Sequence, residues 1–443
     1  MLAYHLRIAV KSLRRTPVLS ALLVAGIALG IAVSTAFVAA YHTVSRDPIP
    51  AKSRHLFYVS LDSWDKERPF DDDQPKEPPD QNTYRDAVAL LGSKLPTRQT
   101  AMYKAELTVF PEKREERPFR ARTRVTFGDF FPLFDAPFQY GGGWGKEADQ
   151  RPQAVVVLDR DTNDKLFGGV NSIGRRVRIE DREFTVSGVL APWYPKPKFY
   201  DPHNGAFEQA EQIYIPFRFT EPMRLLRART GNLSNWKSFN WDVDAEFFAS
   251  EAVWIQYWVQ LDTPKQKEAY TSWLAGYAGE QKKLGRFERP INNKLRDVRE
   301  WLRYKEVVPR SSRTMLLISL LFLVVSSVNL IGILLGKFLA RSPEVGMRRA
   351  LGASRRHVFL QHLIECELVG VLGGIVGVGL SLIVLRGIDN LRRLGEQGPP
   401  LYQAELPMLA IGILLALAAG LVAGLYPAWR ICRIPPAAHL KAQ

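Results

Sequence analysis

Four long stretches of the chain are almost entirely apolar, and they limit its fold more than any other feature of the sequence. Residues 18–40, 314–336 and 406–429 contain no charged side chain, and residues 358–385 contain none after Glu367. About 20 apolar residues suffice to cross the hydrocarbon core of a bilayer. Four such stretches exceed what the core of a soluble domain needs, so we predict transmembrane helices at 18–44, 314–336, 358–385 and 406–429.

A cleaved signal peptide is the alternative for the first stretch. Four basic residues precede it, and Val38-Ala39-Ala40 has the small residues of a cleavage site. The apolar stretch is, however, longer than the roughly 7–15 residues of a signal-peptide core. We therefore expect an uncleaved anchor, preceded by an amphipathic helix over residues 1–17 that lies along the membrane interface.

The distribution of positive charge predicts the orientation of the spans. Residues 1–17, 337–357 and 430–443 together carry 13 Lys and Arg, against three in the short loop 386–405. Positively charged loops stay in the cytoplasm. Both termini and the 337–357 loop are therefore expected inside, and the 386–405 loop outside together with the long segment between the first two spans.

That long segment has the texture of a mixed α+β domain. Residues 45–313 contain 44 Lys and Arg against 39 Asp and Glu, so most of the net charge of +15 lies at the membrane edges, which argues against a nucleic-acid partner. Alternating and apolar patterns predict strands at 101–110, 119–127, 153–158 and 252–261, a hairpin at 175–190, and helices at 83–95, 160–167 and 264–283. We expect a domain over 45–289 and a stalk helix over 290–313.

The predicted fold class is therefore an α-helical integral membrane protein with four transmembrane helices, both termini inside, and a large α+β extracytoplasmic domain between helices 1 and 2. No pattern typical of catalysis or metal binding accompanies it. Cys366 and Cys432 fall in or beside apolar stretches, and no Cys–His zinc spacing occurs. The GxxxxGK[ST] phosphate loop is absent, because residues 169–176 (GVNSIGRR) lack its Lys. We expect no metal and no directly bound cofactor, with ATP and Mg on a partner chain if ATP is used.

Small and polar residues inside the spans are candidates for helix contacts. Three GxxxG pairs permit close approach of helices, either within one chain or across a dimer interface: Gly26 and Gly30, Gly373 and Gly377, and Gly420 and Gly424. The intramembrane polar candidates are Asn329, Glu365 and Glu367, and such groups are often functional. For the two Glu we favour a structural ion pair with Arg430 or Arg433.

The basic loop between spans 2 and 3, RSPEVGMRRALGASRR (341–356), predicts a short helix. Ser342 is a suitable N-cap, and Pro343 suits the first turn. Glu344 lies four residues before Arg348, the favourable order for an ion pair. An apolar face comprises Met347, Ala350 and Leu351, Gly352 is expected to end the helix, and Ser354 to cap the next one.

Two longer motifs carry a family resemblance. The segment SPEVGMRRALGASRRHVFLQHLIECELVGVLGGIVGVGL (342–380) resembles the E-[IV]-G-[IVM]-[RK]-[RK]-A-[LI]-G-A motif and the following span of the MacB/FtsX superfamily of ABC-transporter permeases. Residues 125–190 are similar to the MacB-type periplasmic core domain. The large external domain suits MacB-like members better than FtsX itself. MacB carries a fused ATPase ahead of the interfacial helix, whereas this sequence starts at that helix and resembles members with a separate ATPase.

The resemblance implies a multi-pass protein of the bacterial inner membrane with its large domain in the periplasm. The implied partners are separate ABC ATPase subunits, a second permease (a copy or a paralogue), a periplasmic membrane-fusion adaptor and an outer-membrane channel. The permease would transmit ATP-driven motion to its periplasmic domain and so drive export of periplasmic cargo. The residues implied in coupling to the ATPase are Glu344, Val345, Gly346, Met347, Arg348, Arg349, Ala350 and Gly352.

Three other functions stay open at this point. An FtsX-like regulator would relay ATP hydrolysis to an envelope enzyme, and what the external domain captures would distinguish it from an exporter. A lipoprotein-release permease would take its cargo from the inner membrane. An enzyme is the third alternative, and only the size of the external domain supports it.

Overall fold

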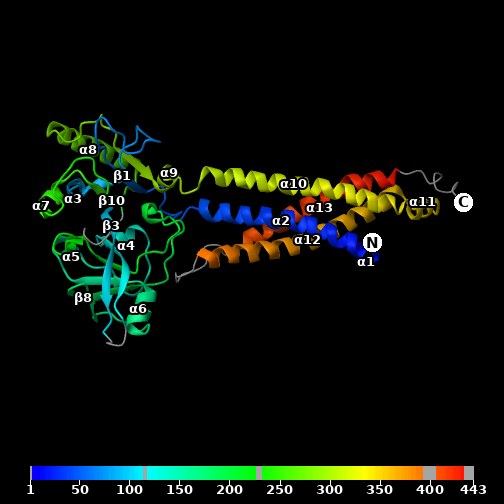
Figure 1. The fold of residues 1–443 in the computed structure, drawn as a ribbon, viewed down its shortest axis with the longest axis horizontal. Helices are drawn as coiled ribbons and strands as arrows, with labels where there is room; N and C mark the ends of the chain where they lie inside the picture. The colour runs from blue at the N-terminus through cyan, green and yellow to red at the C-terminus, as the bar shows by residue number, and fades with distance from the viewer. Residues whose placement is uncertain (1, 113–116, 226–231, 393–405, 434–443) are drawn as a thin grey trace. The chain divides into compact units, whose positions relative to one another are not determined.

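The computed structural model describes residues 2–112, 117–225, 232–392 and 406–433. The chain divides into two compact units, one formed by residues 1–45 and 308–443 and the other by residues 46–307. The first consists of helices and is called the helical unit below. The second contains the β-strands and is called the sheet unit (Figure 1).

Within its described residues, the helical unit has four helices that are long and apolar enough to cross a membrane. They are α2 (Pro17–Ser45), α10 (Arg310–Leu339), α12 (Arg355–Arg392) and α13 (Leu406–Cys432). The four predicted stretches are thus confirmed as helices, each longer than its apolar core, by three residues in α13 and by ten in α12. Two shorter helices accompany them, α1 (Leu2–Arg15) before α2 and α11 (Ser342–Ala350) between α10 and α12 (Figure 1).

The long helices pack around α2, which contacts α10, α12 and α13. Their shared core is apolar and includes Leu23, Ile27 and Ile31 of α2. Helix α10 is the least covered, because only 22% of its apolar window is buried against 39–44% for the others. Large apolar side chains on the uncovered faces suit contact with lipid.

The short loop and the tail predicted from charge are described only in part. Helix α12 continues to Arg392, so Arg386 belongs to that helix and not to the loop predicted over 386–405. Residues 393–405 and 434–443 lie outside the described residues.

The sheet unit is built on one mixed sheet with the strand order β11-β1-β10-β3-β4-β9-β6-β8-β5; β2 pairs with β10, and β7 with β3 and β8. Neighbours are antiparallel except β4 with β9 and β6 with β8. The strands are β1 (Leu56–Ser60), β2 (Asn82–Thr83), β3 (Arg98–Phe110), β4 (Phe119–Thr126), β5 (Phe138–Gly141), β6 (Val155–Leu158), β7 (Arg176–Ile179), β8 (Arg182–Leu190), β9 (Ile213–Pro216), β10 (Val253–Gln260) and β11 (Lys294–Asp297).

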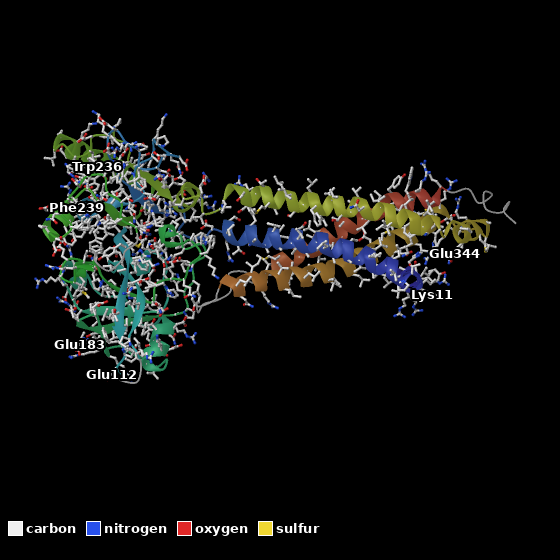
Figure 2. All side chains as sticks on the ribbon, viewed as in Figure 1. Lys11, Glu112, Glu183, Trp236, Phe239 and Glu344 are labelled. Atoms are coloured by element: carbon white, nitrogen blue, oxygen red, sulfur yellow. The ribbon has the colours of Figure 1, made fainter. Side chains whose placement is uncertain are left out.

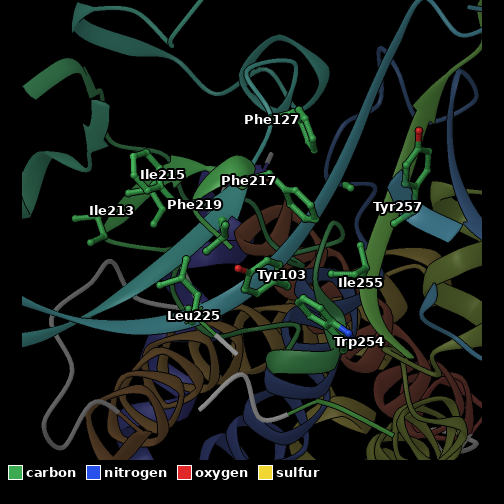
Figure 3. Close-up of a cluster of buried hydrophobic side chains, with 14 of the residues drawn as sticks. Tyr103, Phe127, Ile213, Ile215, Phe217, Phe219, Leu225, Trp254, Ile255 and Tyr257 are labelled. Atoms are coloured by element: carbon green, nitrogen blue, oxygen red, sulfur yellow. The ribbon is translucent and has the colours of Figure 1, made fainter. Parts of the chain in front are cut away.

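Both faces of this sheet are buried under apolar clusters. Alternate residues of a strand point to opposite faces, so a single strand contributes to both clusters. In β1, Phe57 and Val59 join one apolar cluster, whereas Leu56 and Tyr58 join the other. Figure 3 shows part of the first cluster, where the Tyr103 ring meets Trp254 edge to face. The helices of this unit are α3 (Tyr84–Leu90), α4 (Phe130–Leu133), α5 (Lys146–Gln150), α6 (Arg160–Phe167), α7 (Asp244–Ala249), α8 (Pro264–Lys283) and α9 (Val298–Tyr304).

Most of the predicted elements of this unit are confirmed, including the hairpin β7–β8 and the helices α6 and α8. The stalk helix predicted over 290–313 is wrong. Strand β11 pairs with β1 there, and Asp297 then starts α9 through a capping box with Glu300. Helix α9 is held because Trp301 stacks on Tyr58 with ring centroids 3.6 Å apart. Within the irregular segment 192–250, the sequence reading also missed β9 and α7.

Candidate functional site

Helices α1 and α11 lie at the same end of the helical unit, together with the last residues of α10 and α13 and the first of α12. Lys11 of α1 and Glu344 of α11 mark this end in Figure 2. We call it the α11 end. Three sequence-distant segments meet here, so it is the place where a partner could contact several helices at once.

The local sequence explains why α11 forms and where it stops. Pro343 occupies its first turn, and Arg348 donates to Oε1 of Glu344 at 2.8 Å. Gly352 follows with φ +98°, a conformation that glycine adopts without strain. Ser354 then caps α12, since its Oγ accepts from the amide of His357 at 3.2 Å. The N-cap is Arg341 rather than the predicted Ser342, which is buried as the first helical residue.

The residues predicted to couple to an ATPase divide into an exposed and a buried group. Met347 is 63% exposed and the adjacent Leu351 83% exposed, so the predicted apolar face is open. Glu344, Arg348, Ala350 and Gly352 are exposed as well. Val345 and Gly346 are buried instead, and in this structure they seat the helix against its neighbours rather than offering a contact.

Arg349 ties α11 to a second span. Its Nη1 donates to the carbonyl oxygen of Cys432, the last residue of α13, at 3.1 Å. The C-terminal half of α11 is therefore hydrogen-bonded to α13. The chain itself connects α11 to α10 on one side and to α12 on the other. The sequence pattern assigned Arg349 only to the coupling contact and gave no signal for this link.

A buried polar cluster lies beneath α11. Lys337 at the end of α10 forms an ion pair with Glu365 of α12, with Nζ 2.7 Å from Oε1. Ser12 of α1 donates to the same carboxylate oxygen, and Arg341 donates to the Ser12 hydroxyl. Four segments thus share one network, in which the buried charges of Lys337 and Glu365 compensate each other.

The predicted partners of Glu365 are wrong, because Lys337 and Ser12 occupy its carboxylate while Arg433 lies over the Trp429 ring. The alignment of the two helices determines the partner. Lys337 directly follows the apolar stretch of α10, and its ammonium group lies beside the Glu365 carboxylate of α12. The positive-inside argument uses Lys337 and Arg341 only to orient the loop, and no pattern in the sequence points to Ser12. One sequence signal does point to the Lys337–Glu365 pair. Lys337 directly follows one apolar stretch, and Glu365 lies near the start of the next.

Of the other two polar candidates, Asn329 is an uncharged amide, and Glu367 has no ion pair within the described residues. Asn329 is exposed on the uncovered face of α10, inside the apolar stretch. Glu367 is half-buried beside Gly420, whose added Cβ would lie 3.3 Å from Oε2 of that Glu. The structure therefore leaves Asn329 on a face of α10 that the other described helices do not cover.

The six GxxxG glycines all face other helices of the same chain. A Cβ added to Gly377 would lie 2.6 Å from the carbonyl oxygen of Ala28, and one added to Gly424 would lie 2.4 Å from Cβ of Cys366. Gly373 meets Ile27, Gly420 meets Gly370, Gly26 meets Leu330, and Gly30 meets Leu323. These glycines thus allow α2, α10, α12 and α13 to approach closely within one chain.

Among the described residues, no group of three or more His, Cys, Asp or Glu is placed to hold a metal ion. Cys366 and Cys432 are buried free thiols. In the sheet unit, Arg124 forms a fully buried network with Asp201 and Glu211, in which the charges compensate each other.

Comparisons with known proteins match both units. A model of the MacB-like periplasmic core domain matches residues 20–275, and a model of the FtsX-like permease C-terminal region matches residues 316–436. The macrolide export ATP-binding/permease protein MacB of Syntrophobacter fumaroxidans is 24% identical over 360 residues, which cover 73% of this chain and 49% of that protein. The pyoverdine export ATP-binding/permease protein PvdT of Pseudomonas fluorescens is 25% identical over 83% of this chain and 50% of its own length.

The chain thus spans about half the length of these two curated relatives. Among solved structures, the periplasmic region of MacB from Actinobacillus actinomycetemcomitans matches 56% of this chain and 92% of its own, with 14% identity and a TM-score of 0.36.

Proposed function

Because the chain belongs to the family of MacB/FtsX-like permeases, we propose that it is a permease subunit that transmits the motion of a separate ATPase to its sheet unit. The family match supports an ABC-type transporter permease. In this proposal the α11 end faces the cytoplasm, as the positive charge of its segments favours. The sheet unit then lies in the periplasm, and its movement drives export of cargo from there.

The observation that carries the proposal is the open apolar surface of α11. Met347 and Leu351 are largely exposed on a short helix whose other side is buried and hydrogen-bonded. Burial of a Leu or Met side chain contributes roughly 1.5–3 kcal/mol, enough to anchor a docking contact. The exposed ion pair of Glu344 and Arg348 adds polar specificity at its rim.

A second permease subunit is proposed to cover α10. This helix is the least buried span, and its open face carries Asn329 in an otherwise apolar setting. An amide in hydrocarbon is unfavourable unless it finds a hydrogen-bond partner, and a facing Asn329 or a polar group of a paralogue would provide one. Either partner would complete a permease pair.

The direct test is purification of the full chain from native membranes with whatever ATPase and permease accompany it. We expect an ATPase to co-purify, and its loss from a Met347→Glu, Leu351→Glu variant would locate the contact. An adaptor bound to the sheet unit would support export. An envelope hydrolase bound in its place would favour the FtsX-like regulator, and captured lipoprotein would favour lipoprotein release.

A further inference from the structure

A cavity of about 250 Å³ opens at the α11 end between α1, α11 and the first turns of α12. Basic side chains line it from two directions. Lys11 and Arg15 come from α1, and Arg341 and Arg348 come from the α11 segment. The apolar centre of the proposed ATPase contact, Met347 and Leu351, does not line this cavity, although the Glu344–Arg348 pair at its rim does.

The charges around this cavity do not cancel. Two acids line it, but Glu344 is paired with Arg348 and Glu365 with Lys337. Arg341 donates to the hydroxyl and the carbonyl oxygen of Ser12, which are neutral acceptors.

Lys11 and Arg15 form no ion pair within the described residues, and both are exposed at the cavity. Together with Arg341, three positively charged side chains therefore line the cavity with no ion pair of their own within the described residues. An anion that enters it would meet ammonium and guanidinium donors at once.

The cavity also has an apolar side, which favours an anion that carries apolar groups as well as a charge. Ile8 of α1 and Val345 and Val358 of the α11–α12 segment line it beside the basic groups. Helix α1 further exposes Leu6 and Val10, which suit the acyl region of a leaflet. An anion held here would have its charged part among Lys11, Arg15 and Arg341 and apolar parts continuing toward the spans.

From this arrangement we propose that the cavity binds the phosphate headgroup of an anionic phospholipid. Basic pockets between membrane helices are known to suit such headgroups. The lipid would bridge α1 and α11 and so stiffen the junction between the interfacial helix and the α11 segment. Free phosphate shares this headgroup chemistry, and the experiment below separates the two sources.

The test uses the full chain in neutral detergent, titrated with short-chain phosphatidylglycerol or phosphatidylcholine and followed by native mass spectrometry. We expect at least tenfold tighter binding of phosphatidylglycerol. A Lys11→Ala, Arg15→Ala variant should lose about tenfold in that affinity. The matched control is Arg7→Ala, Arg14→Ala, which removes the same charge from exposed positions of α1 that do not line the cavity and should change binding less than twofold.

Two results would overturn the proposal. Equal loss in both double variants would show diffuse attraction to α1 instead of a site, and equal binding of the two lipids would remove the role of charge. Inorganic phosphate is the third arm. Undiminished lipid binding in millimolar phosphate supports the lipid, whereas displacement at concentrations comparable to the lipid would assign the cavity to a soluble anion.

Discussion

The ammonium nitrogen of Lys337 in α10 lies 2.7 Å from Oε1 of Glu365 in α12, and both side chains are almost completely buried. Removal of one partner would leave an uncompensated charge at the edge of the bilayer. We expect Lys337→Met to lower the free energy of unfolding in mixed micelles by about 3–5 kcal/mol. The double variant Lys337→Met, Glu365→Gln should recover much of this loss, because no charge is then left unpaired.

The exposed pair of Glu344 and Arg348 is the matched control for that experiment. Its side chains are 45% and 44% exposed, so Glu344→Gln should change the free energy of unfolding by less than about 1 kcal/mol. Equal losses from Lys337→Met and Glu344→Gln would contradict a special role for the buried pair.

The role of the apolar surface of α11 in ATPase docking can be tested by introducing a charged side chain there. Met347→Glu or Leu351→Glu should weaken ATPase docking roughly tenfold or more, because a charge replaces side chains that would be buried in the contact. The measurement is the amount of ATPase retained, and its ATP turnover, with the permease in nanodiscs. Arg356→Ala, a substitution at an exposed position six residues beyond the end of α11 at Ala350, serves as control. Full docking and turnover in both glutamate variants would remove α11 as the contact.

Two glycines of α12 provide a steric test of span packing. A Cβ at Gly377 would lie 2.6 Å from a backbone oxygen of α2, whereas one at Gly379 would meet nothing within 4 Å. Gly377→Ala should therefore lower the unfolding free energy by about 1–3 kcal/mol, and Gly379→Ala should be neutral or slightly stabilising. Thermal unfolding in detergent compares the two, and equal behaviour would contradict the close approach of α2 and α12.

Asn329 tests the proposed permease pair. In a background with Cys366 and Cys432 replaced by Ala, Asn329→Cys should cross-link in membranes to a second copy or to a co-purifying permease. Asn329→Leu should weaken the pairing by about 0.6–2 kcal/mol, measured by energy transfer between labelled subunits in nanodiscs. If Asn329→Cys forms no cross-link with either partner, α10 does not face the second subunit.

Asp159 in the sheet unit predicts a pH dependence. Burial raises the pKa of this carboxyl from 3.8 to about 6, against hydrogen bonds from Thr162 that lower it. The folded state thus holds the proton more tightly, so this group's stabilising contribution is complete below pH 4 and is lost as the pH rises through 6.

The substitution Asp159→Asn keeps the N-cap of α6 but carries no charge. Amides of α6 should therefore be better protected from hydrogen exchange in the variant than in the wild type at pH 7.5, by about 1–2 kcal/mol. The difference should shrink toward pH 4.5. A constant difference across that range would contradict titration of Asp159.

The sequence predicted the helical unit well because its signal is strong and local. Each span is a long uncharged stretch, and α11 is bounded by Pro343 and Gly352, whose backbone preferences act at short range. The amphipathic helix α1 and the Glu344–Arg348 pair follow from the same local rules.

The predictions that were wrong concern contacts between distant segments. The partner of Glu365 depends on how α10 and α12 align, and no periodicity encodes that alignment. The sequence predicts a helix where the short strand β11 forms, because the pairing of β11 with β1 bridges more than 230 residues of sequence. Tertiary pairing overrides local propensity most easily in such four-residue elements.

The hydrogen bond from Arg349 to the Cys432 carbonyl also has a mechanical consequence. A short rod fixed at one point can pivot, whereas one fixed at separated points must carry its supports with it. Helix α11 is joined to α10 and α12 through the chain and to α13 through Arg349. A push on Met347 would therefore be shared among three spans as one displacement, rather than dissipated by rotation of α11 about a single joint.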